Sequence, residues 1–534
     1  MDTPARTRKR VLACLAAAAL AAVAIGAAVP ATATIGAAPA SAVPGDPAVV
    51  TTDKGAVRGA VHDGLRSFQG IPYAAPPGRW ASPGPAAPWT GVRDATRPGP
   101  GCAQPVGLPV GVPGEAEDCL YLNVTTPARR GDDLPVIVWI HGGDMMYGTG
   151  DMYGPDRLAA DAVVVSVNYR LGVMSFLTHP ALDAGSAYGS GSFALEDQQA
   201  ALRWVRANID RFGGDAGNVT IMGQSGGGYA VCDHLASPAS AGLFDRAVIQ
   251  SAPCATGGSR TRAEAEADSA AVIKAVGCDA AADVAACLRS SETTVAELLA
   301  AYGPWGEPRP VSGTPLLPLS PAEAFRTGRF NRVPVLVGVN HDEENGRYGG
   351  MEVSPGGKPI PAEAYESTVR ERYGAHADAI LARYPLSAYG NSAGLALATI
   401  DSDRNWAKPT YDTAKLLSKW TRTYMFEFAE EETPWFVGYD EPSFPWRAHH
   451  MAELAYQFDL ALFPALTDTQ DRLADRLIAA WTRFAEDGDP NGGRDGGWRR
   501  FTERRPHVQS LTSGRWKPTD FTRDHRYAFW SSLS

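Results

Sequence analysis

A serine flanked by glycines follows an apolar run near the middle of the chain. The pentapeptide Gly223-Gln224-Ser225-Gly226-Gly227 comes directly after Val219-Thr220-Ile221-Met222, and a helical pattern begins at Tyr229. G-x-S-x-G between a strand and a helix is typical of a nucleophile elbow, a turn so tight that its flanks must be glycine. The pattern predicts Ser225 as a nucleophile for acyl transfer. Alone it is unspecific, because a chain with 56 glycines can contain it by chance.

Such a serine needs a base for its proton, a carboxylate to orient that base and donors for the oxyanion. The small residues of His141-Gly142-Gly143-Asp144 follow an apolar run and can offer backbone N–H groups. Acids stand in Asp342-Glu343-Glu344, where a third apolar run ends, and α/β sites assemble at the carboxyl ends of strands. Spacing does not choose among these three acids. The base is expected after Ser225, where seven histidines stand: His234, His341, His376, His449, His450, His507 and His525.

The apolar runs that must position these residues have the pattern of buried strands in a parallel sheet. They cover residues 135–140, 162–167, 219–222 and 333–339. Apolar residues at helical spacing predict a helix over 195–211, which Gly213-Gly214 ends. This alternation predicts an α/β fold with a large, mostly parallel central sheet flanked by helices. Regions 260–320 and 355–465 are richer in helical patterning and are expected to be insertions that cap the sheet, not separate domains.

The N-terminus has the pattern of a cleavable export signal. Basic residues from Arg6 to Arg10 precede an alanine-rich run, and Ala40-Ser41-Ala42 is a small-residue cleavage site. We expect residues 1–42 to be a signal peptide, residues 43–534 to form a single α/β domain, and the mature protein to be secreted. No later stretch has the length and apolarity of a membrane span. A net charge of −10 argues against a nucleic-acid partner.

The cysteines fit an oxidising compartment. Cys102 and Cys119, and likewise Cys278 and Cys287, are close enough in sequence to close local loops as disulfides. Cys232 and Cys254 are instead expected to be small buried apolar groups without a bridge.

Many further motifs, in order along the chain, resemble the type-B carboxylesterase family, which includes cholinesterases and bacterial para-nitrobenzyl-esterase-like members. The resemblance covers nearly the whole mature chain. Besides the elbow, it is carried by Phe68-Gln69-Gly70-Ile71-Pro72-Tyr73-Ala74, Glu117-Asp118-Cys119-Leu120-Tyr121-Leu122-Asn123-Val124, Asn168-Tyr169-Arg170-Leu171-Gly172, Phe212-Gly213-Gly214-Asp215, Gly338-Val339-Asn340-His341-Asp342-Glu343 and Gly488-Asp489-Pro490-Asn491. It implies an α/β-hydrolase fold, with helical insertions over the active site.

The resemblance also selects among the open candidates. It implies a triad of Ser225 as nucleophile, Glu343 as acid and His450 as base, because His450-Met451-Ala452-Glu453 matches the family's His-Gly-x-Glu. His449 is the alternative base if the register is shifted by one. A metal site of His449, His450 and Glu453 is disfavoured, since adjacent histidines rarely face the same way.

Further roles follow from the same resemblance. The oxyanion donors become the backbone N–H groups of Gly143, Asp144 and Gly226. The disulfides become Cys102–Cys119 and Cys278–Cys287. Two ion pairs with structural roles are implied, Arg79 with Glu117 and Arg170 with Asp197.

The expected activity is that of a secreted serine carboxylesterase, which hydrolyses small-molecule esters through an acyl-enzyme without cofactor or metal. A lipase, or an amide or carbamate hydrolase, would use the same mechanism. A non-catalytic binding protein, as neuroligin-like proteins are, is the alternative from another class. Such proteins typically break the triad, whereas serine, acid and histidine are all present here.

Some positions depart from the family's usual sequence. Asp144 stands where His-Gly-Gly-Gly has its last glycine, and its carboxylate would oppose oxyanion charge unless it turns away or is paired. Gln224 replaces a common glutamate, and Gly226 replaces a common alanine. The loop from Cys102 to Cys119 contains no tryptophan, so the cation–π platform for a choline ester is missing.

Overall fold

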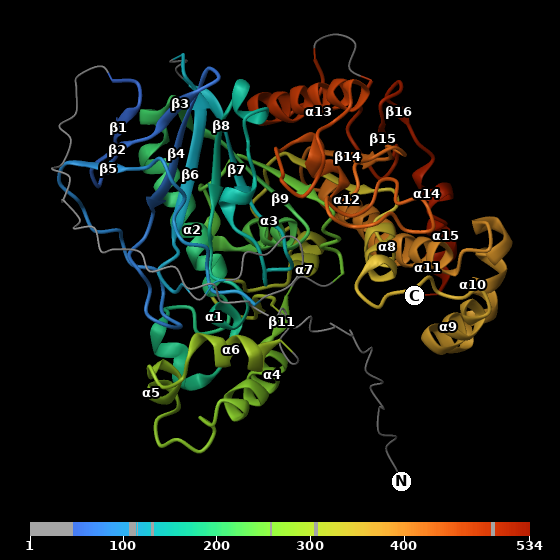
Figure 1. Ribbon diagram of the computed structural model, residues 1–534, viewed down its shortest axis with the longest axis horizontal. Helices are drawn as coiled ribbons and strands as arrows, with labels where there is room; N and C mark the ends of the chain where they lie inside the picture. The colour runs from blue at the N-terminus through green and yellow to red at the C-terminus, as the bar shows by residue number, and fades with distance from the viewer. Residues whose placement is uncertain are drawn as a thin grey trace, which may run out of the picture.

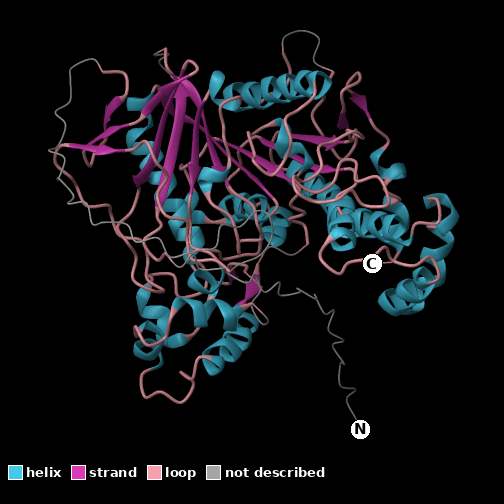
Figure 2. Cartoon of the chain, viewed as in Figure 1, coloured by secondary structure: helices cyan, strands magenta, loops and turns pink. Residues whose placement is uncertain are grey.

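A mixed sheet of eleven strands runs through the centre of the protein in the computed structural model (Figure 1, Figure 2). The structure describes residues 46–105, 114, 116–129, 133–256, 259–303, 308–492 and 497–533, so the expected signal peptide lies outside the described residues. All neighbouring strands from β15 to β8 are parallel, and the edge strands are antiparallel. The order is β16 (Lys517–Pro518), β15 (Val508–Leu511), β14 (Thr423–Phe428), β13 (Val335–Asn340), β10 (Arg246–Gln250), β9 (Gly214–Gln224), β7 (Leu134–Ile140), β8 (Val163–Val167), β6 (Tyr121–Pro127), β4 (Leu65–Pro72) and β3 (Ala60–His62).

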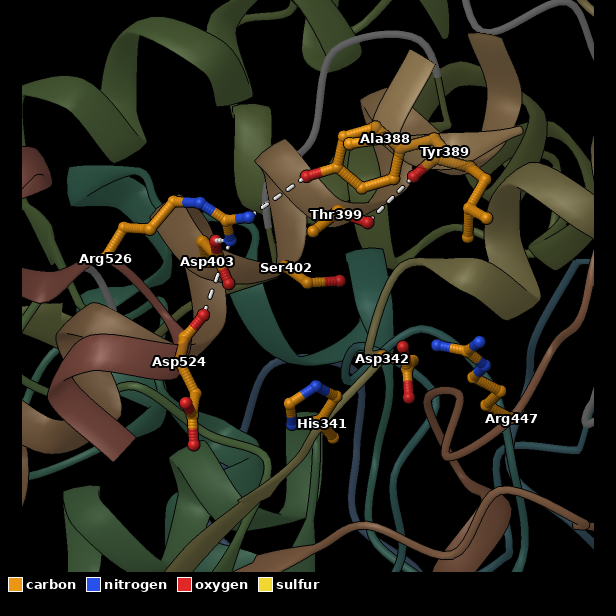
Figure 3. A pocket seen from close by; sticks show the side chains of 11 residues that line it. His341, Asp342, Ala388, Tyr389, Thr399, Ser402, Asp403, Arg447, Asp524 and Arg526 are labelled. Carbon is orange, nitrogen blue, oxygen red and sulfur yellow. Dashed lines mark hydrogen bonds and ion pairs between the residues drawn. The ribbon is translucent and has the colours of Figure 1, made fainter. Parts of the chain in front are cut away.

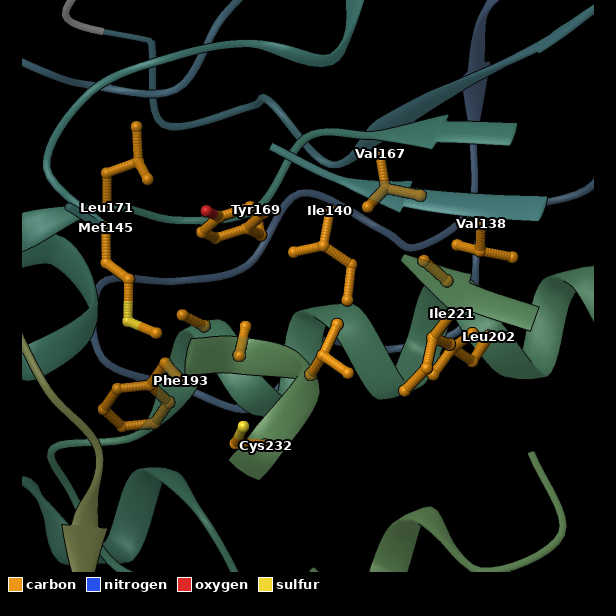
Figure 4. Close-up of a cluster of buried hydrophobic side chains, with 14 of the residues drawn as sticks. Val138, Ile140, Met145, Val167, Tyr169, Leu171, Phe193, Leu202, Ile221 and Cys232 are labelled. Atoms are coloured by element: carbon orange, nitrogen blue, oxygen red, sulfur yellow. The ribbon is translucent and has the colours of Figure 1, made fainter. Parts of the chain in front are cut away.

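Helices cover both faces of this sheet because its central strands are apolar on both sides. On β7, Val138 and Ile140 belong to the core shared with α2 (Phe193–Asn208) and α3 (Gly226–Ala236), part of which is drawn in Figure 4. The alternate residue Trp139 belongs to the core shared with α13 (Asp468–Asp487). The predicted α/β architecture with a mostly parallel sheet is therefore confirmed.

The predicted elements are found with shifted ends. The four predicted runs become β7, β8, β9 and β13, and β9 is longer than its run because it begins at Gly214, which pairs with Leu134. The predicted helix is α2, whose last predicted turn is the 3₁₀ segment Ile209–Phe212. Gly213 ends this segment with a φ of 94°, a left-handed conformation that favours glycine.

The first predicted insertion, 260–320, is mainly helical, but the second, 355–465, is only partly an insertion. It contains β14, which pairs with β13 and β15 inside the central sheet, and its helices lie mostly before that strand. The first contains α4 (Arg262–Ala275), α5 (Val284–Arg289) and α6 (Val295–Tyr302), which gather at one end of the molecule (Figure 1). The second contains α9 (Ala364–Tyr373), α10 (Ala377–Arg383) and α11 (Ala393–Ser402), which build a separate small core. The remaining elements are α1 (Gly172–Phe176), α7 (Pro321–Thr327), α8 (Asn345–Val353), α12 (Lys408–Ser418), α14 (Phe521–Asp524), α15 (Tyr527–Ser532), β1 (Val49–Thr51), β2 (Ala56–Arg58), β5 (Val92–Asp94), β11 (Arg260–Thr261) and β12 (Val311–Ser312).

Three disulfides are formed, and one of them corrects the sequence prediction. Cys102–Cys119 and Cys278–Cys287 are bridged, as the resemblance implies. Cys232 and Cys254, expected as separate buried thiols, are also bridged, with Cα atoms 6.4 Å apart. The reason is topological: β9 and β10 are parallel neighbours, so the helix after one strand lies beside the loop after the other.

Two buried or half-buried ion pairs hold loops in place, one between the loop after β8 and α2 and the other between two loops. Arg170 Nη2 lies 2.7 Å from Asp197 Oδ1, and both side chains are nearly inaccessible to solvent. Arg79 Nη2 lies 2.9 Å from Glu117 Oε1. Both pairs agree with the resemblance. Among the described helices, none has the combination of length and apolarity that crossing a membrane requires.

Candidate active site

Ser225 occupies the sharp turn between β9 and α3. Its backbone has a φ of 55° and a ψ of −122°, a strained conformation for a residue with a side chain. The Ser225 N–H donates to the Gln250 carbonyl on β10 over 3.0 Å. A Cβ at Gly223 would stand 2.4 Å from Gly227 C, and a Cβ at Gly227 would stand 2.0 Å from Ile140 O. Both flanks must therefore be glycine, and Ser225 is partly exposed between buried neighbours.

Glu343 and His450 meet just beyond the end of β13. His450 Nδ1 lies 2.5 Å from Glu343 Oε2, and Glu343 Oε1 accepts the Asn340 N–H over 2.9 Å. The His450 N–H also donates to the Glu343 carbonyl over 2.9 Å. Of the three acids in this loop, the structure thus brings Glu343 to a histidine, whereas the Glu344 carboxylate accepts the Trp406 indole N–H.

His449 lies in a different environment from His450. Its ring is fully buried beside Trp435 and Phe436, with ring centroids 5.6 and 5.2 Å apart. Its Nδ1 lies 2.8 Å from the His450 carbonyl and its Nε2 lies 3.3 Å from the Pro434 carbonyl. Burial lowers the pKa of His449 to about 4, so the ring stays neutral. Because its ring nitrogens face backbone carbonyls, His449 is not placed to act with Glu343.

The charges around His450 stabilise its protonated form, the imidazolium. Burial lowers the pKa of the His450 imidazole, but the adjacent Glu343 carboxylate outweighs burial and the net shift is upward. Glu453 lies in the 3₁₀ segment Ala452–Tyr456, which follows His450, and burial and the Glu343 charge raise its pKa to about 7. Asn340 Nδ2 and Gln250 Nε2 both donate to Glu453. A carboxyl with this pKa is only partly ionised at neutral pH and adds less negative charge beside the triad than an ordinary glutamate would.

The far side of the His450 ring faces Gln224 in this structure. His450 Nε2 lies 3.1 Å from Gln224 Nε2, and Gln224 is 2% exposed. The hydrogen bonds among the described residues do not include one between Ser225 Oγ and His450. Hydrogen bonds of catalytic groups are often long or misaligned until substrate is present. For proton transfer, His450 Nε2 must exchange Gln224 for Ser225 Oγ as its partner.

The candidate donor loop lies directly against the elbow. A Cβ on Gly226 would stand 2.9 Å from Asp144 N and 2.7 Å from Met145 N. Gly143, Asp144 and Met145 have φ values of 94°, 55° and 57°, so the loop takes three successive left-handed residues. The loop amides of Asp144 and Met145 thus lie directly beside Gly226, the residue after Ser225, and Gly143, Asp144 and Gly226 remain candidate oxyanion donors.

The Asp144 side chain is paired. Arg309 Nη2 lies 2.6 Å from Asp144 Oδ1, and the side chains are 21% and 59% exposed respectively. Arg309 was not singled out in the sequence, because a partner 165 residues away in a loop leaves no local pattern. The same is true of Trp406, whose ring centroid lies 4.6 Å from that of His450. Neither residue belongs to a motif that spacing could identify.

One group of histidines and carboxylates in the described part of the chain is compact enough to consider for a metal ion: His341, Glu427 and His525. Glu427 Oε1 lies 2.8 Å from His341 Nδ1 and 2.6 Å from His525 Nε2. Ligands of a tetrahedral zinc ion, with bonds of about 2.0–2.1 Å, stand roughly 3.3 Å apart. Burial alone would lower the pKa of His525, but hydrogen bonds to Asp403 and Glu427 raise it to about 10. The group is therefore a charge-assisted hydrogen-bond network.

A polar cavity of about 370 Å³ adjoins this network (Figure 3). His341, Asp342 and Arg447 line one side, and Asp403 and Arg526 line the other. None of Ser225, Glu343 and His450 lines it. The cavity therefore borders the loop of His341 and Asp342 but does not include the candidate nucleophile Ser225.

Comparisons with known proteins agree with this geometry. The profile of the carboxylesterase family matches residues 46–530. The chain is 34% identical to the fumonisin B1 esterase of Sphingopyxis macrogoltabida, over 89% of this chain and 88% of that protein. It is 32% identical to the para-nitrobenzyl esterase of Bacillus subtilis (strain 168), over 83% of this chain and 90% of that protein.

A solved structure shows the same likeness in three dimensions. A structure of a PNB esterase superposes with a TM-score of 0.72 and 29% sequence identity. The match covers 90% of this chain and all of the other. The sheet and its flanking helices are accordingly those of an α/β-hydrolase fold.

Proposed function

Because the chain belongs to the carboxylesterase family and is therefore a carboxylic ester hydrolase, we propose that it acts through a triad of Ser225, His450 and Glu343. Two observations carry the proposal: Ser225 is a strained, partly exposed serine at the elbow, and a histidine–glutamate pair from distant parts of the chain lies against its neighbour Gln224, whose Nε2 is 3.1 Å from His450 Nε2. The His450–Glu343 distance of 2.5 Å is that of a short, charge-assisted hydrogen bond.

In the first half-reaction, Ser225 Oγ attacks the ester carbonyl carbon while His450 Nε2 takes the hydroxyl proton. Glu343 holds the Nδ1–H and stabilises the imidazolium that forms. The tetrahedral oxyanion accepts hydrogen bonds from the N–H groups of Gly143, Asp144 and Gly226. The C–O bond to the alcohol then breaks, and His450 gives its proton to the leaving alcohol.

In the second half-reaction, His450 takes a proton from water as the water attacks the acyl-enzyme. The second tetrahedral oxyanion uses the same donors, and the proton returns to Ser225 Oγ as the acid leaves. The upward pKa shift of His450 suits this role, because a general base is most effective when its pKa lies near the working pH.

The substrate class is a small-molecule carboxylic ester. Support comes from the relatives named as esterases of para-nitrobenzyl esters and of fumonisin B1. We also propose that residues 1–42 are removed on export and that residues 43–534 form one catalytic domain that is secreted. Three disulfides support an oxidising destination.

The test is a chain-length series of p-nitrophenyl esters with wild type, S225A and the matched surface variant S354A. We expect S225A to lose turnover while S354A keeps it. Near-wild-type turnover by S225A would overturn the proposal, and cleavage restricted to long, aggregated esters would reassign the protein as a lipase. The base is tested separately: H450Q should be inactive and H449Q, if folded by circular dichroism, should remain active.

A further inference from the structure

The Asp144 carboxylate stands close to the place where negative charge would develop during catalysis. Asp144 offers its own N–H to the donor loop, and a carboxylate cannot lie more than about 5 Å from the amide nitrogen of its residue. Its φ of 55° and the close approach of Gly226 fix the backbone, so the side chain cannot move far from the elbow. An unpaired charge here would oppose the oxyanion.

Arg309 is held against this carboxylate by several contacts. Its Nη1 donates to the Pro308 carbonyl over 2.8 Å, and its Cζ lies 5.0 Å from the centre of the Tyr229 ring. Tyr229 in turn belongs to the first turn of α3, where its N–H donates to the Ser225 carbonyl over 2.9 Å. The guanidinium is therefore fixed between the donor loop and the nucleophile helix.

A second carboxyl near Arg309 does not compete for its charge. Asp233 on α3 is fully buried, and neither of its carboxylate oxygens has a hydrogen-bond partner among the described residues. Burial raises the pKa of Asp233 well above its ordinary value, which favours the neutral carboxylic acid. The charge of Arg309 is left for Asp144.

We propose that Arg309 is a positioning residue that neutralises Asp144 beside the oxyanion donors, so that the site presents no net charge to the oxyanion or to the acyl group. The proposal rests on the proposed function of Ser225 and its donor loop. The paired charges cancel, so the site neither repels the oxyanion nor attracts an anionic acyl chain. Removing either partner exposes the charge of the other.

The size of the effect follows from Coulomb's law. Two unit charges about 6 Å apart at an effective dielectric of about 20 alter a rate by roughly 100-fold. Asp144 is more than half exposed, so water screens part of this interaction. We therefore expect R309M to lower kcat by about tenfold for p-nitrophenyl butyrate, with a smaller change in KM.

The first experiment is a double-mutant cycle on p-nitrophenyl butyrate. R309K should retain most of kcat, because it keeps the charge, and D144G/R309M should have a higher kcat than R309M, because no carboxylate is left to neutralise. The control R157M breaks a half-exposed pair of the same 2.6 Å length, with Asp471 on α13, and should leave kcat unchanged. If R309M keeps the wild-type kcat, or if D144G/R309M is no faster than R309M, the proposal is wrong.

The second experiment measures charge preference with two acyl groups of similar length, p-nitrophenyl butyrate and the mono-p-nitrophenyl ester of succinate. The ratio of kcat/KM for the anionic ester to that for the neutral ester should rise in D144G and fall in R309M. If Arg309 has a purely structural role, R309M will lower kcat/KM equally for both esters, and that result would refute the proposal. Failure of the triad would appear instead as activity in S225A, so the two failures are distinguishable.

Discussion

The replacement Gln224→Glu gives the sharpest test of the electrostatics around His450. Gln224 Nε2 lies 3.1 Å from His450 Nε2, on the opposite side of the ring from Glu343. A glutamate at this position would put a second carboxylate beside the imidazolium. The charged form of His450 is then stabilised, so its pKa rises. Because the reaction needs neutral His450, the acid limb of the profile of kcat/KM against pH moves to higher pH.

Coulomb's law gives an upper bound for the rise of the His450 pKa in Q224E, and partial protonation of the new carboxylate reduces it. Unit charges about 4 Å apart at an effective dielectric of about 20 interact by about 4 kcal/mol, which corresponds to about three pKa units. Gln224 is almost fully buried, so an introduced carboxylate is itself partly protonated, as the buried Glu453 is. We therefore expect an upward shift of about one unit.

The assay is kcat/KM for p-nitrophenyl butyrate from acid to alkaline pH, read at the isosbestic wavelength of nitrophenol. In wild type, the acid limb should already lie above the ordinary histidine value of about 6.5, since the net pKa shift of His450 is upward. The control is Q470E, which adds the same charge at the capping position of α13 and should leave the limb in place. If folded Q224E has its acid limb at the same pH as wild type, or at a lower pH, the reasoning is refuted.

Other parts of the site and fold give independent predictions. E343Q should lower kcat by about 10⁴-fold with little change in KM, because the imidazolium loses its anionic partner; steady-state kinetics that show a loss of tenfold or less would contradict this. G226A should lower kcat by about tenfold or more, because its Cβ would meet Asp144 N at 2.9 Å and displace an oxyanion donor; an unchanged kcat would mean that the loop yields freely. C232S/C254S should lower the free energy of unfolding by about 3 kcal/mol in urea denaturation, because the bridge closes a separation of 22 residues. Equal urea midpoints for the variant and the wild type would show that this disulfide does not stabilise the fold.

The sheet could be predicted from the sequence because its central strands are buried on both faces. Such strands must be continuously apolar, so residues 135–140 or 333–339 indicate a strand without knowledge of their neighbours. Local chemistry also sets the elbow, whose flanking glycines are required by contacts below 2.5 Å. These features depend on residues near each other in the sequence.

The rest depends on contacts between distant loops. Spacing could not choose Glu343 from its acidic neighbours or His450 from His449; the family resemblance made that choice, and the geometry then placed the two side chains 2.5 Å apart. The Cys232–Cys254 bridge was mispredicted because a sequence separation of 22 does not reveal that two parallel strands bring their following segments together. The Arg309–Asp144 pair has no sequence signal at all.

The departures at Gly226 and Asp144 are coupled by their backbones. With Asp144 held at a φ of 55°, its amide nitrogen comes so close to the elbow that a Cβ at position 226 would stand 2.9 Å away. An alanine at position 226, common elsewhere in the family, is therefore incompatible with this loop conformation unless the donors retreat. The aspartate in turn introduces a charge that Arg309 offsets over 2.6 Å. Gly226, Asp144 and Arg309 thus form one structural unit, and G226A alone should lower kcat more than G226A/D144G does.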